Sequence, residues 1–271
     1  MKLISLNVAG GRWLQQLLAF LRQQNEQIDI FCFQEVISQY GYEGIPEAAH
    51  RLVPEHLDEQ VCSGDIAKAL EHKLVYLSPH CDVERHAPSG NAIYANTPSG
   101  FDGLKNFDFK TFDLFSYEKK GKNVSLQTLA FEFYDDQKPG KTKTKLCVMN
   151  IHGVHVEQGK IDTPERIRQM EKIRDIVSFL NRRYENPDMI LCGDFNLNPN
   201  TFCIDMIEDM GFRNLITEFG ITNTRSSLYS KKERYADYIF VSNGILVNSF
   251  NVLDVEISDH LPLMLDFDLV K

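Results

Sequence analysis

The chain lacks the features that mark membrane proteins and exported proteins. None of its apolar runs reaches the length of about eighteen residues that a membrane-spanning helix needs. Residues 1–8 have the pattern of a strand, and Gly10 and Gly11 interrupt the apolar stretch before it is long enough for a signal peptide. We therefore expect a cytoplasmic protein.

Cysteines in paired spacing are also lacking. None of the six forms a C-x-x-C pair, and three lie inside apolar, strand-like runs. This arrangement favours buried thiols in a reducing compartment over a disulfide framework or a zinc site. The cysteines are Cys32, Cys62, Cys81, Cys147, Cys192 and Cys203.

Positively charged residues are fewer than negatively charged ones: the chain has 29 Lys and Arg residues and 38 Asp and Glu residues, for a formal net charge of -9. A protein that holds duplex nucleic acid non-specifically is usually basic. The balance counts against a tight duplex binder but allows an enzyme that contacts only a few phosphates. Three basic stretches, 119–122, 138–145 and 231–234, lie in expected hairpin turns, and we interpret them as solvated loops.

What the chain does contain is typical of a globular fold, with 43% hydrophobic and 25% charged residues. No internal repeat or low-complexity linker divides it, so we expect one domain over residues 1–271. Proline and glycine break the regular pattern within residues 38–85. That segment is either a substrate-side insertion or a simple cover over one end of a sheet, and the sequence favours neither interpretation over the other.

Apolar periodicity predicts strands and helices along the whole chain. Leucines recur at helical spacing from Leu14 to Leu21, between two strands. Thr163, Pro164 and Glu165 supply the cap, first position and first turn of a longer helix. Further helical pieces are expected at 46–60, 64–72 and 201–210. Strands are expected at 2–8, 28–33, 74–78, 89–96, 107–117, 123–134, 144–151, 235–241, 251–256 and 263–269, with antiparallel pairing in the middle third.

Polar side chains follow several of these apolar runs. Asp194 and Asn196 stand two residues apart after the run that begins at Met189, so both point to the same side. Asn7, Glu35 and His152 occupy similar positions at the ends of other strands. Sites assemble at such strand ends in many layered folds, and carboxylates with imidazoles suit Mg²⁺-assisted attack of water on a phosphoester.

Asp237 stands alone inside an aromatic and aliphatic strand. A buried carboxylate without a partner is costly, so it needs one. We expect His260 to be that partner, with the carboxylate fixing the imidazole tautomer.

Six short motifs occur in a fixed order along the chain: Leu6-Asn7, Gln34-Glu35, Asn150-Ile151-His152, Gly193-Asp194-Phe195-Asn196, Ala236-Asp237-Tyr238-Ile239-Phe240 and Ser258-Asp259-His260-Leu261-Pro262. The set, which spans the whole chain, resembles the endonuclease/exonuclease/phosphatase superfamily, the DNase I-like group of Mg²⁺-dependent phosphodiesterases and phosphatases. The resemblance implies an α/β four-layer sandwich, in which two packed, mostly antiparallel sheets are flanked by helices.

The resemblance also implies a role for each matching residue. The metal, Mg²⁺ with Mn²⁺ as a possible substitute, is expected on Glu35, Asn7 and Asp259. Contacts to the substrate phosphate are expected from Asn7, Arg166 and Asn196. The catalytic residues are expected to be His152, Asp194, Asn196, Asp237 and His260.

Two departures narrow the expected function. Where abasic-site nucleases of the family carry tryptophans, this chain has Asn223-Thr224-Arg225-Ser226, and Ala9 replaces a second early carboxylate. Both argue against base excision repair. We expect a phosphodiesterase or nuclease acting on nucleic acid or nucleotides. The alternatives are a phosphatase or phospholipase acting on inositol phosphates or sphingomyelin, and a non-catalytic binding protein on the same fold.

Overall fold

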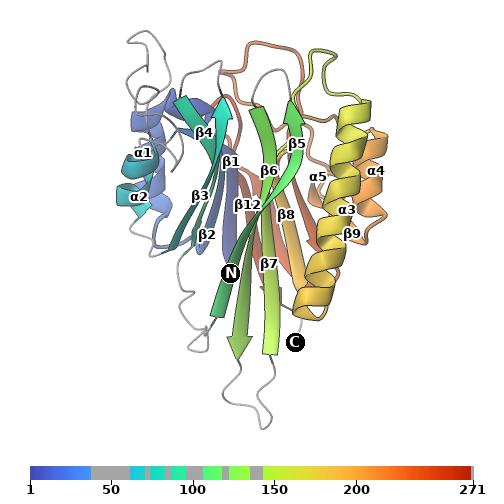
Figure 1. Ribbon diagram of the computed structural model, residues 1–271. Coiled ribbons are helices and arrows are strands. Elements are labelled where there is room, and N and C mark those ends of the chain that lie inside the picture. The colour runs from blue at the N-terminus through green and yellow to red at the C-terminus, as the bar shows by residue number, and fades with distance from the viewer. Residues whose placement is uncertain are drawn as a thin grey trace.

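In the computed structural model of the protein, the structure describes residues 1–37, 62–70, 74–82, 87–95, 106–117, 122–134 and 143–269. These residues form two six-stranded sheets that pack against each other, with helices on the outer faces (Figure 1). The expected α/β four-layer sandwich is confirmed.

The first sheet has the strand order β11-β12-β1-β2-β4-β3. Its strands are β1 (Lys2–Asn7), β2 (Ile30–Ile37), β3 (Leu74–Asp82), β4 (Ala87–Ala95), β11 (Ile245–Val252) and β12 (Leu263–Leu269). The second sheet has the order β5-β6-β7-β8-β10-β9. Its strands are β5 (Asn106–Tyr117), β6 (Lys122–Tyr134), β7 (Lys143–His152), β8 (Asp188–Asp194), β9 (Phe212–Asn214) and β10 (Asp237–Ser242).

Helices cover both outer faces of this pair of sheets. The 3₁₀ turn η1 (Ala9–Gly11) leads into α1 (Leu14–Gln24), which lies with α2 (Ser63–Leu70) on one side (Figure 1). On the other side lie α3 (Pro164–Tyr184), α4 (Phe202–Glu208) and α5 (Leu215–Glu218). The expected start of α3 is confirmed, because the Thr163 side chain accepts a hydrogen bond from the backbone N–H of Arg166 and Pro164 is its first residue.

One parallel pair in each sheet decides where the strand ends lie. β1 pairs with β2 in parallel, and β7 pairs with β8 in parallel, whereas the remaining described pairs are antiparallel. The carboxyl ends of these four strands therefore meet at one end of the sandwich, the upper end in Figure 1. Asn7, Glu35, His152 and Asp194 lie at that end.

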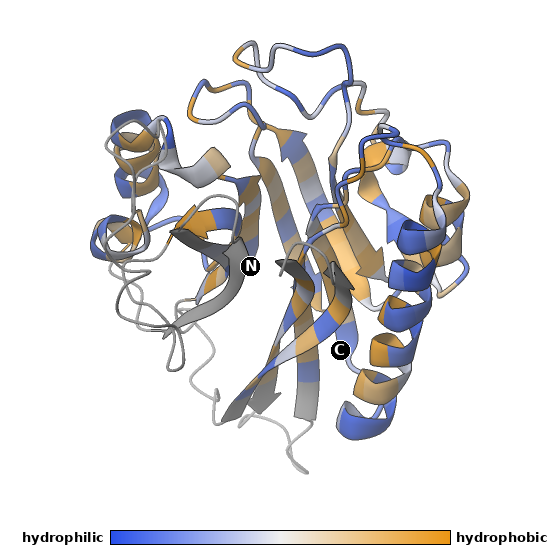
Figure 2. Ribbon diagram, turned by 45° about the horizontal axis from the view of Figure 1, so that its top comes forward, coloured by the Kyte–Doolittle hydropathy of each residue, from blue (hydrophilic) through white to orange (hydrophobic). Residues whose placement is uncertain are grey.

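Among the described residues, hydrophobic side chains fill most of the space between the sheets, and a cluster of amides lies among them. Residues of both sheets, such as Leu3 and Val148, share one core cluster, and the residues beneath α1 and α2 form another. Figure 2 shows the central strands banded in hydrophobic and hydrophilic colours, as expected for strands with alternating faces.

The amide cluster joins the sheets directly. Gln34 of β2 donates to Asn150 Oδ1 of β7 over 2.7 Å, and Asn150 Nδ2 donates to the carbonyls of Phe33 and Ala92 over 3.0 and 3.1 Å. Gln127 of β6 donates to the carbonyl of Asn91 of β4 over 2.8 Å. Because Gln34, Asn91, Gln127 and Asn150 are fully buried, these bonds satisfy groups that water cannot reach.

Several expected elements end at other residues. The strand expected at 251–256 is β11, which runs from Ile245 to Val252. The sequence pattern missed its first residues because β11 lies at the edge of its sheet, where residues such as Leu246 are exposed and the apolar pattern is weak. β3 continues to Asp82 in pairing with β4, past the expected end at 78. The helix expected at 46–60 and residues 38–61 of the proposed insertion lie outside the described residues.

The expected burial of the cysteines is confirmed for the five whose side chains the structure describes. Cys32, Cys62, Cys147, Cys192 and Cys203 are free and buried. Cys81 lies among the side chains outside those described. Within the described part of the chain, no helix combines the length and hydrophobicity required to cross a membrane.

A glycine at the end of β8 gives the fold a sharp test. Gly193 has φ +132, and a Cβ there would lie 2.0 Å from the Ile151 carbonyl oxygen of the parallel partner strand β7. Gly193→Ala should therefore lower the free energy of unfolding in urea by at least about 3 kcal/mol, since it adds a strained backbone to a steric overlap.

Gly64→Ala in α2 is the matched control, because nothing lies within 4 Å of its Cβ position, and the same added methyl should change stability by less than about 1 kcal/mol. Equal effects of the two substitutions would contradict the close approach of β7 and β8.

Candidate active site

The upper end of the sandwich collects polar side chains from both sheets around the buried carboxylate of Asp194. One Asp194 oxygen, Oδ1, accepts a hydrogen bond from the backbone N–H of Asn196 over 2.8 Å. The other, Oδ2, accepts from Asn7 Nδ2 over 3.1 Å and lies 3.7 and 3.8 Å from the Nε2 atoms of His260 and His152. Asp194 is thus the group on which the two sheets converge.

Asn7 turns its amide nitrogen toward the carboxylates. Its Oδ1 accepts the backbone N–H of Ala9 over 2.9 Å, and its Nδ2 donates to Glu35 Oε1 and to Asp194 Oδ2, each over 3.1 Å. A backbone N–H can only donate, so the orientation of the amide is fixed. In this orientation the N–H donor of Asn7 suits a phosphate oxygen, and its expected role at the metal stays a prediction.

Glu35 reaches the site through an irregularity in its strand. The β2–β4 register shifts between Phe33 and Val36, so that Gln34 and Glu35 lie opposite the single residue Asn91. Glu35 has φ 55, the left-handed region, as do Asn196 at φ 54 and Ala9 at φ 49. Such bulges and left-handed residues redirect side chains and cluster at functional sites.

His260 and Asp237 form the pair that the sequence predicted. His260 Nδ1 lies 2.8 and 2.9 Å from the two carboxylate oxygens of Asp237. The Thr224 hydroxyl donates to Asp237 Oδ2 over 3.1 Å, which holds the carboxylate in place. Both members of the pair are buried, with exposures of 4% for His260 and 2% for Asp237.

The electrostatics of the site stabilise ionised groups. Burial would raise the pKa of Asp194, but the charges of His260, His152, Lys160 and Arg225 outweigh it and hold this pKa well below its ordinary value. Burial would lower the pKa of His260, but the charge and hydrogen bond of Asp237, with the charge of Asp194, raise it above its ordinary value. A carboxylate next to a readily protonated imidazole is thus stable here.

A group of buried side chains in this site has the donor atoms for a metal ion. Among the described residues, ligand atoms of Asp194, Asp237 and His260 all lie within 4.8 Å of one another. This group differs from the expected set of Glu35, Asn7 and Asp259. Asp259 Oδ2 lies 3.6 Å from Arg225 Nη1, so the charge of that carboxylate faces a guanidinium.

His152 and Asn196 complete the inner surface. His152 Nε2 lies 3.7 Å from Glu35 Oε1, and each of these two side chains is 21% exposed. Asn196 Nδ2 donates to the carbonyl of Gly153 over 3.3 Å, and Asn196 is 4% exposed. His152 and Glu35 thus lie at the solvent side of the site, whereas Asn196 lies beneath it.

The structure places Arg166 beneath the loop that follows β7. Arg166 is 1% exposed, and its guanidinium donates to the carbonyls of Val154, Gly159 and Ile161 over 3.3, 2.7 and 2.5 Å. These bonds hold the loop that follows β7. Arg166 therefore supports the backbone near the site, and its expected contact with phosphate stays a prediction.

Two cations in the site were missed by the sequence analysis. Lys160 Nζ donates to the carbonyl of Tyr235 over 2.7 Å, and burial lowers the pKa of Lys160 to about 8 although Asp194 pulls it the other way. Arg225 Nη1 contacts His260 Nε2, since segments 224–226 and 259–261 pair through backbone hydrogen bonds. Lys160 carries no motif, whereas Arg225 was visible only as part of the departure at 223–226.

Comparison with protein families and with solved structures points to one family and one fold. A search of curated proteins returned no match. The fold is similar to that of an endonuclease/exonuclease/phosphatase family protein from Bacteroides thetaiotaomicron, with 16% identity, a TM-score of 0.67, and coverage of 98% of this chain and 94% of that one.

Two further structures share the fold at a similar sequence identity and TM-score. The human Nocturnin catalytic domain with bound sulfate has 16% identity, a TM-score of 0.64, and coverage of 99% of this chain and 93% of that one. ANGEL2, a 2′,3′-cyclic phosphatase in complex with adenosine-2′,3′-vanadate, has 14% identity, a TM-score of 0.69, and coverage of 100% and 96%. The model of the Endonuclease/Exonuclease/phosphatase family matches residues 4–260, and the chain therefore belongs to that family.

Proposed function

We propose that the protein is a Mg²⁺-dependent phosphodiesterase that acts on nucleic acid or nucleotides by in-line attack of water. The observation that carries the proposal is the buried Asp194–His260–Asp237 group beside Glu35 and His152. It joins an acid–base pair, a second carboxylate and several cations at the strand ends where both sheets meet. A purely structural cluster needs no such combination of buried charges.

The His260–Asp237 pair can move a proton. Asp237 accepts a hydrogen bond from Nδ1, so neutral His260 carries its proton there and keeps a lone pair on Nε2. The contact with Arg225 supports this assignment, because a guanidinium only donates. Once Arg225 Nη1 moves off Nε2, this atom can take a proton from the attacking water, and Asp237 stabilises the imidazolium that forms.

The cations around Asp194 can hold the phosphoester and offset the charge that develops on it. Asn7 Nδ2 supplies a neutral N–H donor, and Lys160 and Arg225 supply positive charge. Because these donors are partly or fully buried, their interaction with a phosphate is screened less than on the surface.

The donor set fits a small divalent cation. Glu35, Asp194 and Asp237 offer carboxylate oxygens, the ligands that Mg²⁺ prefers, and Glu35 and Asp194 are bonded to the same Asn7 nitrogen and so face a shared space. We assign Glu35 and Asp194 as the residues that would hold Mg²⁺, with Mn²⁺ as a possible substitute. When bound, such an ion neutralises phosphate charge and stabilises the leaving oxygen.

The nucleotide class of substrate is supported by one relative. ANGEL2 is described as a 2′,3′-cyclic phosphatase and was solved with an adenosine-based vanadate. The non-catalytic alternative is disfavoured, because the complete acid–base and carboxylate set has been kept in a buried and costly arrangement.

Loss of the imidazole should abolish turnover. In a mixed pool of plasmid DNA, single-stranded DNA and RNA oligonucleotides with Mg²⁺, we expect cleavage that His260→Ala reduces by at least about a hundredfold, because the proton acceptor is gone. His155→Ala is the control, since His155 is exposed and lies only three residues from His152. Cleavage by His260→Ala at the wild-type rate would sink the proposal.

Metal binding can be followed without turnover. Mg²⁺ should raise the melting temperature of the wild type, and Glu35→Gln should remove that rise, because it takes away one carboxylate charge. Glu171→Gln, at an exposed position of α3, should keep it. A rise that survives Glu35→Gln but is lost in Asp237→Asn would place the ion in the buried Asp194–Asp237–His260 group instead.

The His260–Asp237 pair makes the stability depend on pH. The raised pKa of His260 means that imidazolium formation stabilises the folded state below about pH 6.5, and this contribution is lost as the pH rises through the folded-state pKa. By NMR titration in EDTA, His260 should titrate above its ordinary range, and Asp237→Asn should lower its pKa because the carboxylate charge is removed. An unchanged pKa in the variant would contradict the pair.

A further inference from the structure

Next to His260, the loop of residues 223–234 encloses a pocket of about 540 Å³. We propose that this pocket binds a second phosphate group of the substrate, adjacent to the one that is cleaved. The inference rests on the proposed function for the position of the first phosphate. It names the substrate class more narrowly, as a nucleotide or oligonucleotide that presents two phosphates to the protein.

Arg225 connects the pocket with the candidate active site. It lines the pocket, its Nη1 contacts His260 Nε2, and the same atom lies 3.6 Å from Asp259 Oδ2. Its guanidinium carbon lies 4.1 Å from the ring centroid of Tyr229, another lining residue. A ligand in this pocket would therefore lie next to the imidazole that we assign to proton transfer.

The guanidinium of Arg225 is buried but incompletely bonded. Arg225 is 7% exposed, and within the described residues its Nε has no hydrogen-bond partner. A buried donor without a partner destabilises the folded protein, so native structures rarely keep one without reason. Because this donor belongs to a residue that lines an open pocket, an anionic ligand there could satisfy it.

The rim of the pocket adds further positive charge. Lys231, Lys232 and Arg234 are exposed lining residues, and Glu233 is the acidic residue among those that line the pocket. Four cations thus face one carboxylate on a protein whose formal net charge is -9. A local reversal of sign in a concave surface concentrates anions there. We therefore revise our reading of stretch 231–234 as a solvated loop only.

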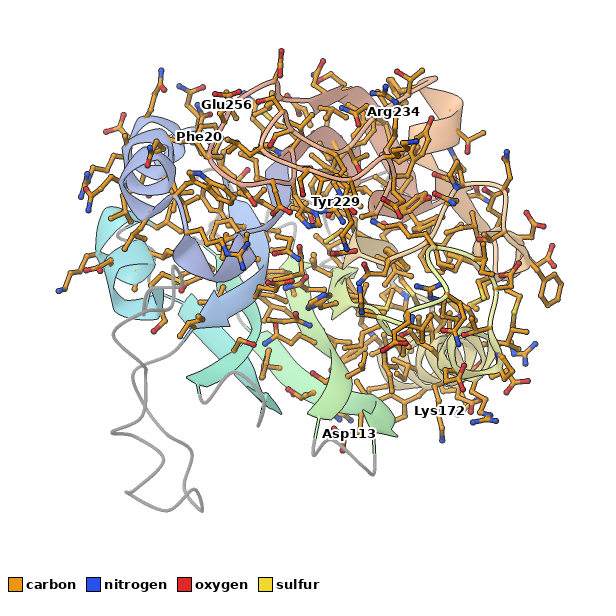
Figure 3. All side chains as sticks on the ribbon, turned by 90° about the horizontal axis from the view of Figure 1, so that it is seen from above. Phe20, Asp113, Lys172, Tyr229, Arg234 and Glu256 are labelled. Carbon is orange, nitrogen blue, oxygen red and sulfur yellow. The ribbon has the colours of Figure 1, made fainter. Side chains whose placement is uncertain are left out.

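The combination of groups favours phosphate over other anions. Two guanidinium and two ammonium groups match several phosphate oxygens, and Tyr229 offers an aromatic ring for a sugar or a base. The volume of about 540 Å³ is within the range of small-molecule sites and exceeds the needs of a single small ion. Seen from above in Figure 3, Tyr229 lies near the middle of this face, with Arg234 farther toward its edge.

The pocket can be tested by binding alone, with EDTA present so that no turnover occurs. Isothermal titration would compare two matched pairs of ligands that differ by one phosphate. Adenosine 5′-monophosphate with adenosine 3′,5′-bisphosphate tests a terminal phosphate. ApA with ApApA tests the next phosphate of a chain. In at least one pair, the ligand with the extra phosphate should bind the wild type about tenfold more tightly.

The variant Lys231→Gln/Lys232→Gln/Arg234→Gln should remove this preference and leave the affinity for the one-phosphate ligand within about twofold, because the rim cations meet only the second phosphate. The matched control is Arg168→Gln/Lys172→Gln/Arg174→Gln, which removes three exposed cations from α3. Lys172 lies well away from Tyr229 in Figure 3. The control should keep the preference, which separates a local effect from one of net charge.

Three outcomes would overturn the inference: equal affinities within both pairs in the wild type, a preference that survives in the rim variant, or failure of every ligand to bind. These outcomes are separate from failure of the proposed function. A protein that keeps the preference but hydrolyses no phosphoester would refute the enzyme assignment alone. A protein that hydrolyses phosphoesters without any preference would refute the second-phosphate pocket alone.

Discussion

The contact between Gln34 and Asn150 is the constraint on which the site depends. Gln34 and Asn150 donate hydrogen bonds across the space between the sheets, and a shift of either sheet would break several of these bonds at once. Gln34 directly precedes Glu35, and Asn150 stands two residues before His152. The cluster that aligns the sheets therefore also sets the distance between the side chains that meet at their ends.

Above this cluster, the buried carboxylate of Asp194 organises the charges. A charge so deeply buried is tolerated only when cations and N–H donors surround it, and these come from strands and loops of both halves of the sandwich. The left-handed backbone at Glu35 and Asn196 adds a further cost. Such expense is typical of sites shaped by function, where stability is traded for a prepared arrangement of charges.

The chain shares its fold with proteins that are named for different activities, among them a mannosyl-6-phosphatase from Bacteroides thetaiotaomicron and a 2′,3′-cyclic phosphatase. Fold alone thus leaves the substrate open, because function depends on side chains carried by loops. In this chain, one such loop holds Arg225 and Tyr229. It replaces the aromatic motif expected of abasic-site nucleases with a basic pocket beside His260.

The sequence by itself determined the layered fold, the position of Asp194 and Asn196 after a buried strand, and the need of Asp237 for a partner. These follow from local rules of periodicity and from the cost of burying a carboxylate. Only the tertiary structure decided three contacts: the Asn7 oxygen accepts the backbone N–H of Ala9, the Arg166 guanidinium donates to backbone carbonyls, and Arg225 contacts His260. The physical reason is that hydrogen-bond partners are chosen by proximity in space. Residues 225 and 260 become neighbours only when their segments pair, and no local pattern records that encounter.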